Sequence, residues 1–144
     1  MPKNAQALAR LRKQQFDRAE QALALANGHL EALLAEKEKL REQMRSIEPP
    51  EGGCGSRLAA VIDQRRAVQR ALEILESRIE AARSEKMQKE RSLKEAHIAW
   101  EQAKSIESQV VGKILARRER EVKNRLDEIA SQLFWRERRE GKES

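Results

Sequence analysis

A row of apolar residues, spaced alternately by three and four positions, constrains this chain more than any other feature. The row crosses the first third of the sequence, and Lys37 is its one polar member. Its apolar members are Phe16, Ala19, Leu23, Ala26, Leu30, Leu33, Leu40, Met44 and Ile47. This spacing places every member on one stripe of an α-helix and is typical of a coiled-coil seam.

A second row of the same kind follows a segment rich in proline and glycine, residues 49–55. Pro49 and Pro50 each disfavour helical geometry in the residue before them, and the glycines allow a tight change of direction. Two seams on either side of a short break predict two helices that pack antiparallel. The members of the second row are Leu58, Val61, Val68, Leu72, Leu75, Ile79 and Ala82, with Arg65 as the one polar residue.

The predicted fold is therefore all-α: a long antiparallel two-helix coiled-coil hairpin that occupies residues 1–144 as one unit. We expect helix one at about residues 5–47, the loop at 48–56 and helix two at about 57–138, because no proline follows Pro50. Matching the seams across the loop gives pairs whose numbers sum to 105, such as Leu33 with Leu72. Helix two then extends beyond helix one by some forty residues, or roughly 60 Å of helix.

The apolar residues of helix two continue along this extension, but they change face near Gly112. Up to Ile114 they continue the seam through Trp100, Ala103 and Val110. Beyond it they are displaced by one position and comprise Val111, Leu115, Val122, Leu126, Ile129 and Leu133. No segment of the chain is left to cover this stripe, which we therefore expect to be a partner surface.

The composition disfavours a globular enzyme. Charged residues make up 38% of the chain and aromatic residues 3%, too little bulky apolar material for a layered core. No stretch approaches the roughly 20 apolar residues that span a bilayer, and Met1 to Arg18 lacks the features of a secretory signal. Cys54 is the single cysteine, which indicates a reducing cytoplasm.

Catalytic, metal and cofactor sites are not predicted. His29 and His97 fall on different helices and far apart in the predicted pairing, so they cannot share a metal. Cys54 has no positioned histidine, and we expect an exposed, unactivated thiol. The glycines around it lack the lysine and the preceding strand of a phosphate-binding loop.

Positive charge gathers in the terminal segments. Residues 1–18 carry a net charge of +4 and residues 113–144 a net charge of +3, whereas the segment between them carries −1. Three interpretations are open: a solvated helix face, a surface for an acidic protein, or a grip on nucleic acid. Acidic residues interspersed among the arginines, such as Glu119 and Glu121, argue against phosphate binding, so no nucleic acid is expected.

Two heptad-bearing arms around a Pro/Gly turn, with Arg-rich segments at both termini, resemble the central-stalk proteins of type III secretion and flagellar export ATPases. The matching features are the opening Leu8-Ala9-Arg10-Leu11-Arg12-Lys13, the loop from Pro49 to Ser56, and the closing Arg117-Arg118-Glu119-Arg120-Glu121 with Arg136-Glu137-Arg138-Arg139. The chain departs from the family pattern in its unequal arms, because a single helix over the last forty or so residues is less rigid than a paired one.

The resemblance implies a non-enzymatic stalk and adaptor, cytoplasmic and peripheral to the inner membrane at a secretion apparatus. The implied partners are a hexameric secretion ATPase, a membrane export-gate protein and secretion chaperones, with no membrane insertion. The residues implied to face the ATPase are Arg10, Arg12, Lys13, Arg117, Arg118, Arg120, Lys123, Arg125, Leu133, Phe134, Trp135 and Arg136. Those implied to face the export gate, at the tip, are Leu40, Met44, Arg57, Leu58, Val61 and Arg65. The alternative is a generic coiled-coil scaffold or assembly protein.

Overall fold

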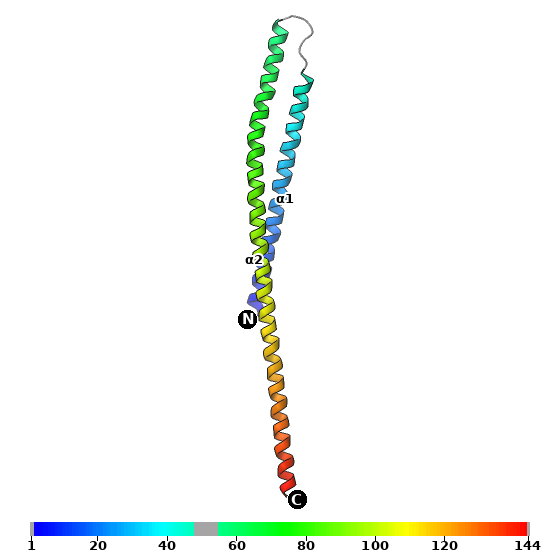
Figure 1. Cartoon of the computed structure of the whole chain (residues 1–144), viewed down its shortest axis with the longest axis vertical. Helices are drawn as coiled ribbons and strands as arrows, with labels where there is room; N and C mark the ends of the chain where they lie inside the picture. Colours follow the sequence, from blue (N-terminus) through cyan, green and yellow to red (C-terminus); the bar gives the residue numbers. More distant parts are fainter. Residues whose placement is uncertain (1, 48–54, 144) are drawn as a thin grey trace. The chain divides into compact units, whose positions relative to one another are not determined.

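The computed structural model describes residues 2–47 and 55–143, and all of them except Ile47 are helical. Helix α1 is Pro2–Ser46, with 45 residues, and helix α2 is Gly55–Glu143, with 89 residues. The prediction of an all-α fold with two long helices packed against each other, the second one longer, is confirmed (Figure 1). The predicted turn, with its prolines and Cys54, lies outside the described residues apart from Gly55 and Ser56.

The helix boundaries differ from the expected ones by a few residues. Helix α1 begins at Pro2, where the fixed φ of proline suits a first helical position and its missing N–H is not needed. Helix α2 already includes Gly55 and Ser56, which the sequence pattern had placed in the loop, and it continues to Glu143. Glycine lowers helix propensity without forbidding helix, so the pattern marked these ends only approximately.

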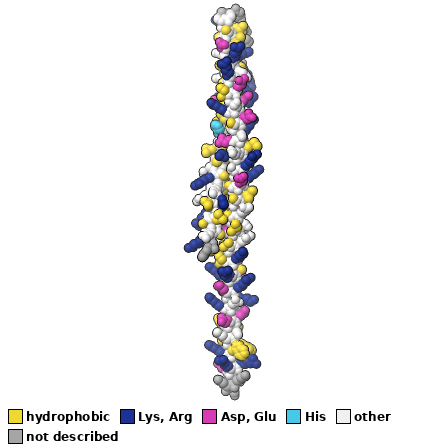
Figure 2. All heavy atoms as spheres, turned by 90° about the vertical axis from the view of Figure 1, so that its left-hand side faces the viewer, with side chains coloured by type: hydrophobic (Ala, Val, Ile, Leu, Met, Phe, Trp, Pro, Cys, Tyr) yellow, Lys and Arg dark blue, Asp and Glu magenta, His cyan; other side chains and the backbone are white. Residues whose placement is uncertain are grey.

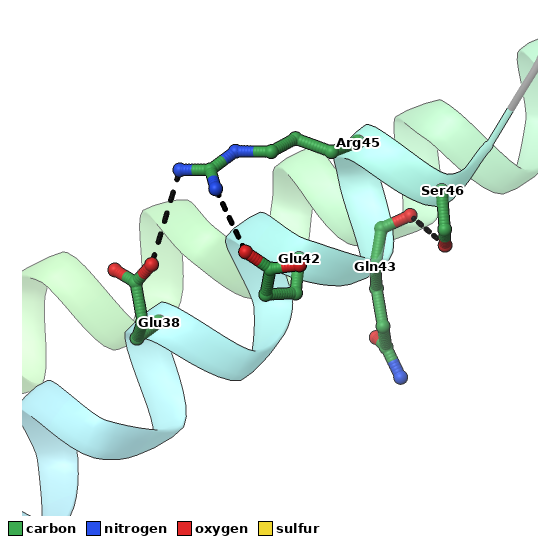
Figure 3. Close-up of polar contacts among 5 residues, drawn as sticks. All are labelled: Glu38, Glu42, Gln43, Arg45 and Ser46. Carbon is green, nitrogen blue, oxygen red and sulfur yellow. Dashed lines mark hydrogen bonds and ion pairs between the residues drawn. The ribbon is translucent and has the colours of Figure 1, made fainter.

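Helix α1 ends in a set of local polar contacts (Figure 3). The Ile47 amide donates to the Gln43 carbonyl at 3.2 Å, and the Ser46 hydroxyl donates to the same oxygen at 2.8 Å. Arg45 pairs with Glu42 at 2.7 Å and with Glu38 at 3.8 Å. The positive Arg45 side chain also suits the negative end of the helix dipole, although exposed pairs of this kind add only about 0–1 kcal/mol.

The chain divides into two compact units. In the unit formed by residues 13–98, α1 and α2 pack through a small apolar cluster. Leu40 packs against this cluster from its edge. Every member comes from the predicted seams, and burying each Leu or Ile stabilises the pair by about 1.5–3 kcal/mol. The buried residues are Leu30, Leu33, Leu75, Ile79 and Ala82.

The register of the two helices differs from the predicted one. The rings of Phe16 and His97 lie 5.5 Å apart, and Lys37 Nζ lies 3.7 Å from Glu76 Oε1, two pairs whose residue numbers sum to 113. The Arg65 guanidinium donates to the Ile47 carbonyl at 3.1 Å, and that pair sums to 112. The predicted sum of 105 was therefore wrong by about one heptad. A shift of seven residues leaves both seams on the same faces, so the pattern could not distinguish the two alignments.

The other unit comprises residues up to Arg12 and from Ala99 onward. Ala5, Ala9 and Ala103 are buried there, and their small side chains permit a close approach of the helix backbones. Pro2 lines a groove together with residues of α2 that lie near the last point of contact: Val110, Lys113, Ile114 and Arg117. Every described side chain of α2 from residue 115 to residue 141 is exposed. None of the described helices is long and apolar enough to cross a membrane.

Candidate partner-binding surface on helix two

The most distinctive surface of the molecule is an uncovered apolar stripe on α2. We define the α2 stripe as Leu115, Val122, Leu126, Ile129 and Leu133, whose exposed fractions lie between 52% and 62%. The spacing of seven, four, three and four positions keeps these side chains on one side of the helix. A comparable leucine in the α1–α2 cluster, Leu75, is 3% exposed. The stripe therefore holds seam-like residues without the helix that would cover a seam.

The α2 stripe does not continue the seam that packs against α1. Ile114, half-buried in the groove beside Pro2, precedes Leu126 by twelve residues, which corresponds to a rotation of about 120° around the helix axis. Extending α1 in its own direction would leave the stripe uncovered. The change of face near Gly112 thus separates two surfaces, one for the chain itself and one without a partner among the described residues.

Charged residues border the α2 stripe. The first half of the stripe forms an open groove of about 380 Å³. The groove is lined by three charged residues together with Leu115, Val122 and Leu126. Arg118 lies three residues after Leu115 and four before Val122 on one side, and Lys123 lies on the other side. Glu119 also lines the groove and falls in line with the apolar residues. From the sequence, Glu119 was identified only as an acid among the arginines, although its position seven residues before Leu126 places it in the seam.

The aromatic pair near the end of α2 lies off the α2 stripe. Trp135 follows Leu126 by nine residues and is rotated by about 180° from it, whereas Leu133 is rotated by only about 20°. Phe134 and Trp135 meet edge to face with their ring centroids 6.2 Å apart, and Arg138 lies 5.8 Å above the Trp135 ring. Trp135 lines a polar groove of about 420 Å³ with Ser131, Gln132, Arg136 and Arg139. Leu133, Phe134 and Trp135, all implied to face the ATPase, therefore do not share one face of the helix.

The residues predicted to face an ATPase lie on both helices, with Arg10, Arg12 and Lys13 on α1 and the others along α2. On the face drawn in Figure 2, basic side chains are interspersed with acidic ones. Arg10 and Arg12 belong to the same compact unit as Arg117 and the residues that follow it on α2. Arg10, Arg117, Arg118, Arg120, Lys123, Arg125 and Arg136 are all exposed, and Arg12 is half-buried. Lys13 is exposed as well and belongs to the unit of residues 13–98.

The residues predicted at the tip divide into packed and exposed ones. Leu40 packs against the buried cluster, and Met44 and Val61 are half-buried. Arg65 is held by the Ile47 carbonyl. Arg57 and Leu58, in the first turn of α2, are exposed, Leu58 by 49%. Only these two offer side chains free for an incoming protein without loss of packing.

Within residues 2–47 and 55–143, no group of three or more His, Cys, Asp or Glu side chains could hold a metal ion. His97 packs against Phe16, and His29 is exposed on α1. The arrangement of two paired helices and an uncovered stripe is that of a coiled-coil protein that acts through contacts with other proteins.

The comparison with protein families agrees with this class. The chain belongs to the flagellar FliJ protein family, whose model matches residues 3–139 and so includes both helices. Members of this family are non-catalytic central-stalk proteins of the flagellar and type III export ATPase, which confirms the resemblance drawn from the sequence. No curated protein and no solved structure shows a significant match to the chain.

Proposed function

We propose that this protein is the stalk and adaptor of a cytoplasmic export ATPase complex, and that the terminal part of α2 inserts into the ring of a hexameric ATPase. The family match supports the stalk role in general. The observation that carries the finer proposal is that α2 residues 115–141 are exposed, basic and partly apolar. A single helix about 10–12 Å wide is narrow enough to enter the opening of a protein ring.

The charge distribution suits contact with several equivalent subunits. Arginines occur around the helix, with Arg117 and Arg118 about 100° apart and Arg120 farther round. Exposed charges of this kind raise the association rate and make it sensitive to salt, whereas a desolvated aromatic residue lengthens the lifetime of a complex. Trp135, with 57% of its surface exposed, is the aromatic residue suited to that second role.

The opposite end of the α1–α2 pair is proposed to contact the membrane export gate. Arg57 and Leu58 are the exposed residues at the start of α2 that could make this contact. Linking ring and gate requires only that the two helices remain paired between them, which the buried cluster around Leu33 and Ile79 provides. Secretion chaperones remain a predicted further class of partner.

Stimulation of the cognate ATPase tests the ring contact. We expect Arg117→Glu with Arg118→Glu to weaken stimulation chiefly at low salt, because salt screens exposed charges over roughly 10 Å at 0.1 M. We expect Trp135→Ala to weaken it at all salt concentrations, by about tenfold or more in affinity. Arg57→Glu is the matched control at the other end, and it should spare ATPase binding while impairing export. Unchanged ATPase affinity in both terminal variants, with helix content retained, would refute the proposed insertion.

A further inference from the structure

The α2 stripe has the geometry of half a coiled coil. Written as heptads, Leu126 and Leu133 occupy one seam position, and Leu115, Val122 and Ile129 occupy the other. A stripe that is two residues wide per heptad fits the seam of one partner helix, and it is narrower than the face of a helix that packs into a globular core. The shape therefore favours a helix as the occupant.

The charged residues that flank the α2 stripe indicate which charge the partner helix carries beside its own seam. Arg118 and Arg125 flank the seam on one side, and Lys123 flanks it on the other. These are the positions whose side chains meet the flanking residues of a partner in a coiled coil, and they set the choice of partner. Acidic side chains in the same positions of the partner would meet an opposite charge on both sides.

The flanking charges do not suit pairing of the α2 stripe with the same stripe of a second copy of the chain. In a parallel pairing Arg118 of one copy would meet Lys123 of the other, and Glu119 would lie opposite its own copy within the seam. A fully overlapped antiparallel pairing would place Arg125 beside its own copy. Like charges in such positions are destabilising, so the pattern excludes self-pairing at this surface.

An anionic membrane surface is also disfavoured. Interfacial helices bury a broad apolar face that includes tryptophan or phenylalanine. Here Trp135 lies on the side opposite Leu126, and Glu119 lies in line with the apolar residues, where it would be repelled by anionic lipid.

We propose that the α2 stripe is a docking seam for an amphipathic helix of another protein, with an apolar heptad stripe and acidic residues on both borders. The proposal rests on the proposed function only in placing a protein partner on this segment. It adds the secondary structure, the seam and the charge pattern of the partner segment. The Glu119 position further calls for a basic residue in the seam of that helix.

A designed peptide tests the docking seam on the full chain. The probe has four heptads with leucine at the seam positions, except for one lysine placed to meet Glu119, and glutamate at both flanking positions, which keeps the peptide from pairing with itself. The comparison peptide carries lysine at the flanking positions. By fluorescence anisotropy, the chain should bind the glutamate peptide at least about tenfold more tightly than the lysine peptide.

Two single substitutions test whether the peptide binds at the α2 stripe and not elsewhere on the chain. Val122→Lys, at a side chain that is 56% exposed, should weaken binding of the glutamate peptide by about tenfold or more. Ile74→Lys, at an apolar side chain that is 57% exposed on the paired part of α2, should leave binding within about twofold. The double variant Arg118→Glu with Lys123→Glu should reverse the preference and bind the lysine peptide more tightly.

Several outcomes would overturn the docking seam. Equal affinity for both peptides, or full binding by Val122→Lys, would refute it. A concentration-dependent dimer that Val122→Lys abolishes would assign the stripe to a second copy. Stripe-dependent binding to phosphatidylcholine vesicles that contain phosphatidylglycerol, without peptide binding, would assign it to lipid. Failure of ATPase stimulation together with selective peptide binding would refute the proposed function and leave the docking seam standing.

Discussion

At the scale of single residues, Lys37 shows how one polar side chain sits in an apolar seam. Its side chain is 22% exposed and reaches Glu76, which is 58% exposed, over 3.7 Å. An ion pair so open to solvent stabilises the fold by about 0–1 kcal/mol. Burying a leucine at a seam position stabilises it by about 1.5–3 kcal/mol. Burial of an apolar side chain thus stabilises the fold more than the ion pair does. Lys37 therefore makes the paired helices less stable than a leucine at the same position would.

We therefore expect Lys37→Leu to raise the free energy of unfolding by about 1 kcal/mol, the difference between these two terms. Urea denaturation followed by circular dichroism measures the change. Lys39→Leu is the matched control, because Lys39 is exposed on the same helix and the substitution there should change stability by less than about 0.5 kcal/mol. A Lys37→Leu variant that is less stable than the parent chain would show that the Glu76 pair matters more than its exposure implies.

At the scale of the two helices, the register is the feature that the sequence could not determine. The seam members were predictable, and Leu30, Leu33, Leu75, Ile79 and Ala82 are all buried. Their pairing was not, because alignments that differ by one heptad match the same apolar positions. Contacts outside the seam distinguish them. Phe16 meets His97 and Lys37 meets Glu76 in the observed alignment, and neither pair follows from periodicity.

Cysteine crosslinking tests the observed register. In a Cys54→Ser background, Leu33→Cys with Ile79→Cys should form an intramolecular disulfide under mild oxidation, because the two residue numbers sum to 112. Leu33→Cys with Leu72→Cys should not, because a slip of one heptad separates the two positions by roughly 10 Å along the axis, beyond the reach of a disulfide. The opposite result, read on a non-reducing gel with mass spectrometry, would restore the originally predicted pairing.

The candidate surface was predictable in part for a related reason. The displacement of apolar residues near Gly112 was visible in the sequence, and the exposure of Leu115 and Leu126 follows it. The separation of Trp135 from Leu133 was not predicted, although both residues lie within two positions of each other in the sequence. Successive helical residues point about 100° apart, so neighbours in the chain rarely share a face.

At the scale of the whole molecule, the paired part of α2 is buried against α1 and the uncovered part is open to solvent, so their backbone amides should differ in protection from hydrogen exchange. The side chains of Leu75 and Ile79 are each 3% exposed, whereas residues 115–141 are all exposed. In isolated protein, amides of residues 115–141 should therefore exchange with solvent faster than those of residues 70–82, because an unpacked helix opens at little cost in free energy. Hydrogen exchange with mass spectrometry measures this. Equal protection of the two segments in a monomer would reveal a cover for the stripe within the chain.

The α2 stripe faces a different direction from the α2 residues that pack against α1, so the sequences of these two surfaces can change independently in evolution. Because Ile114 and Leu126 face different directions, residues that recognise an outside helix carry none of the packing that holds α1 to α2. Whole heptads could be added to or exchanged in the segment 115–133 with little effect on the paired region, since sites without shared neighbours contribute independently. The terminal part of α2 can therefore change along with its partner while the paired region of α1 and α2 stays the same.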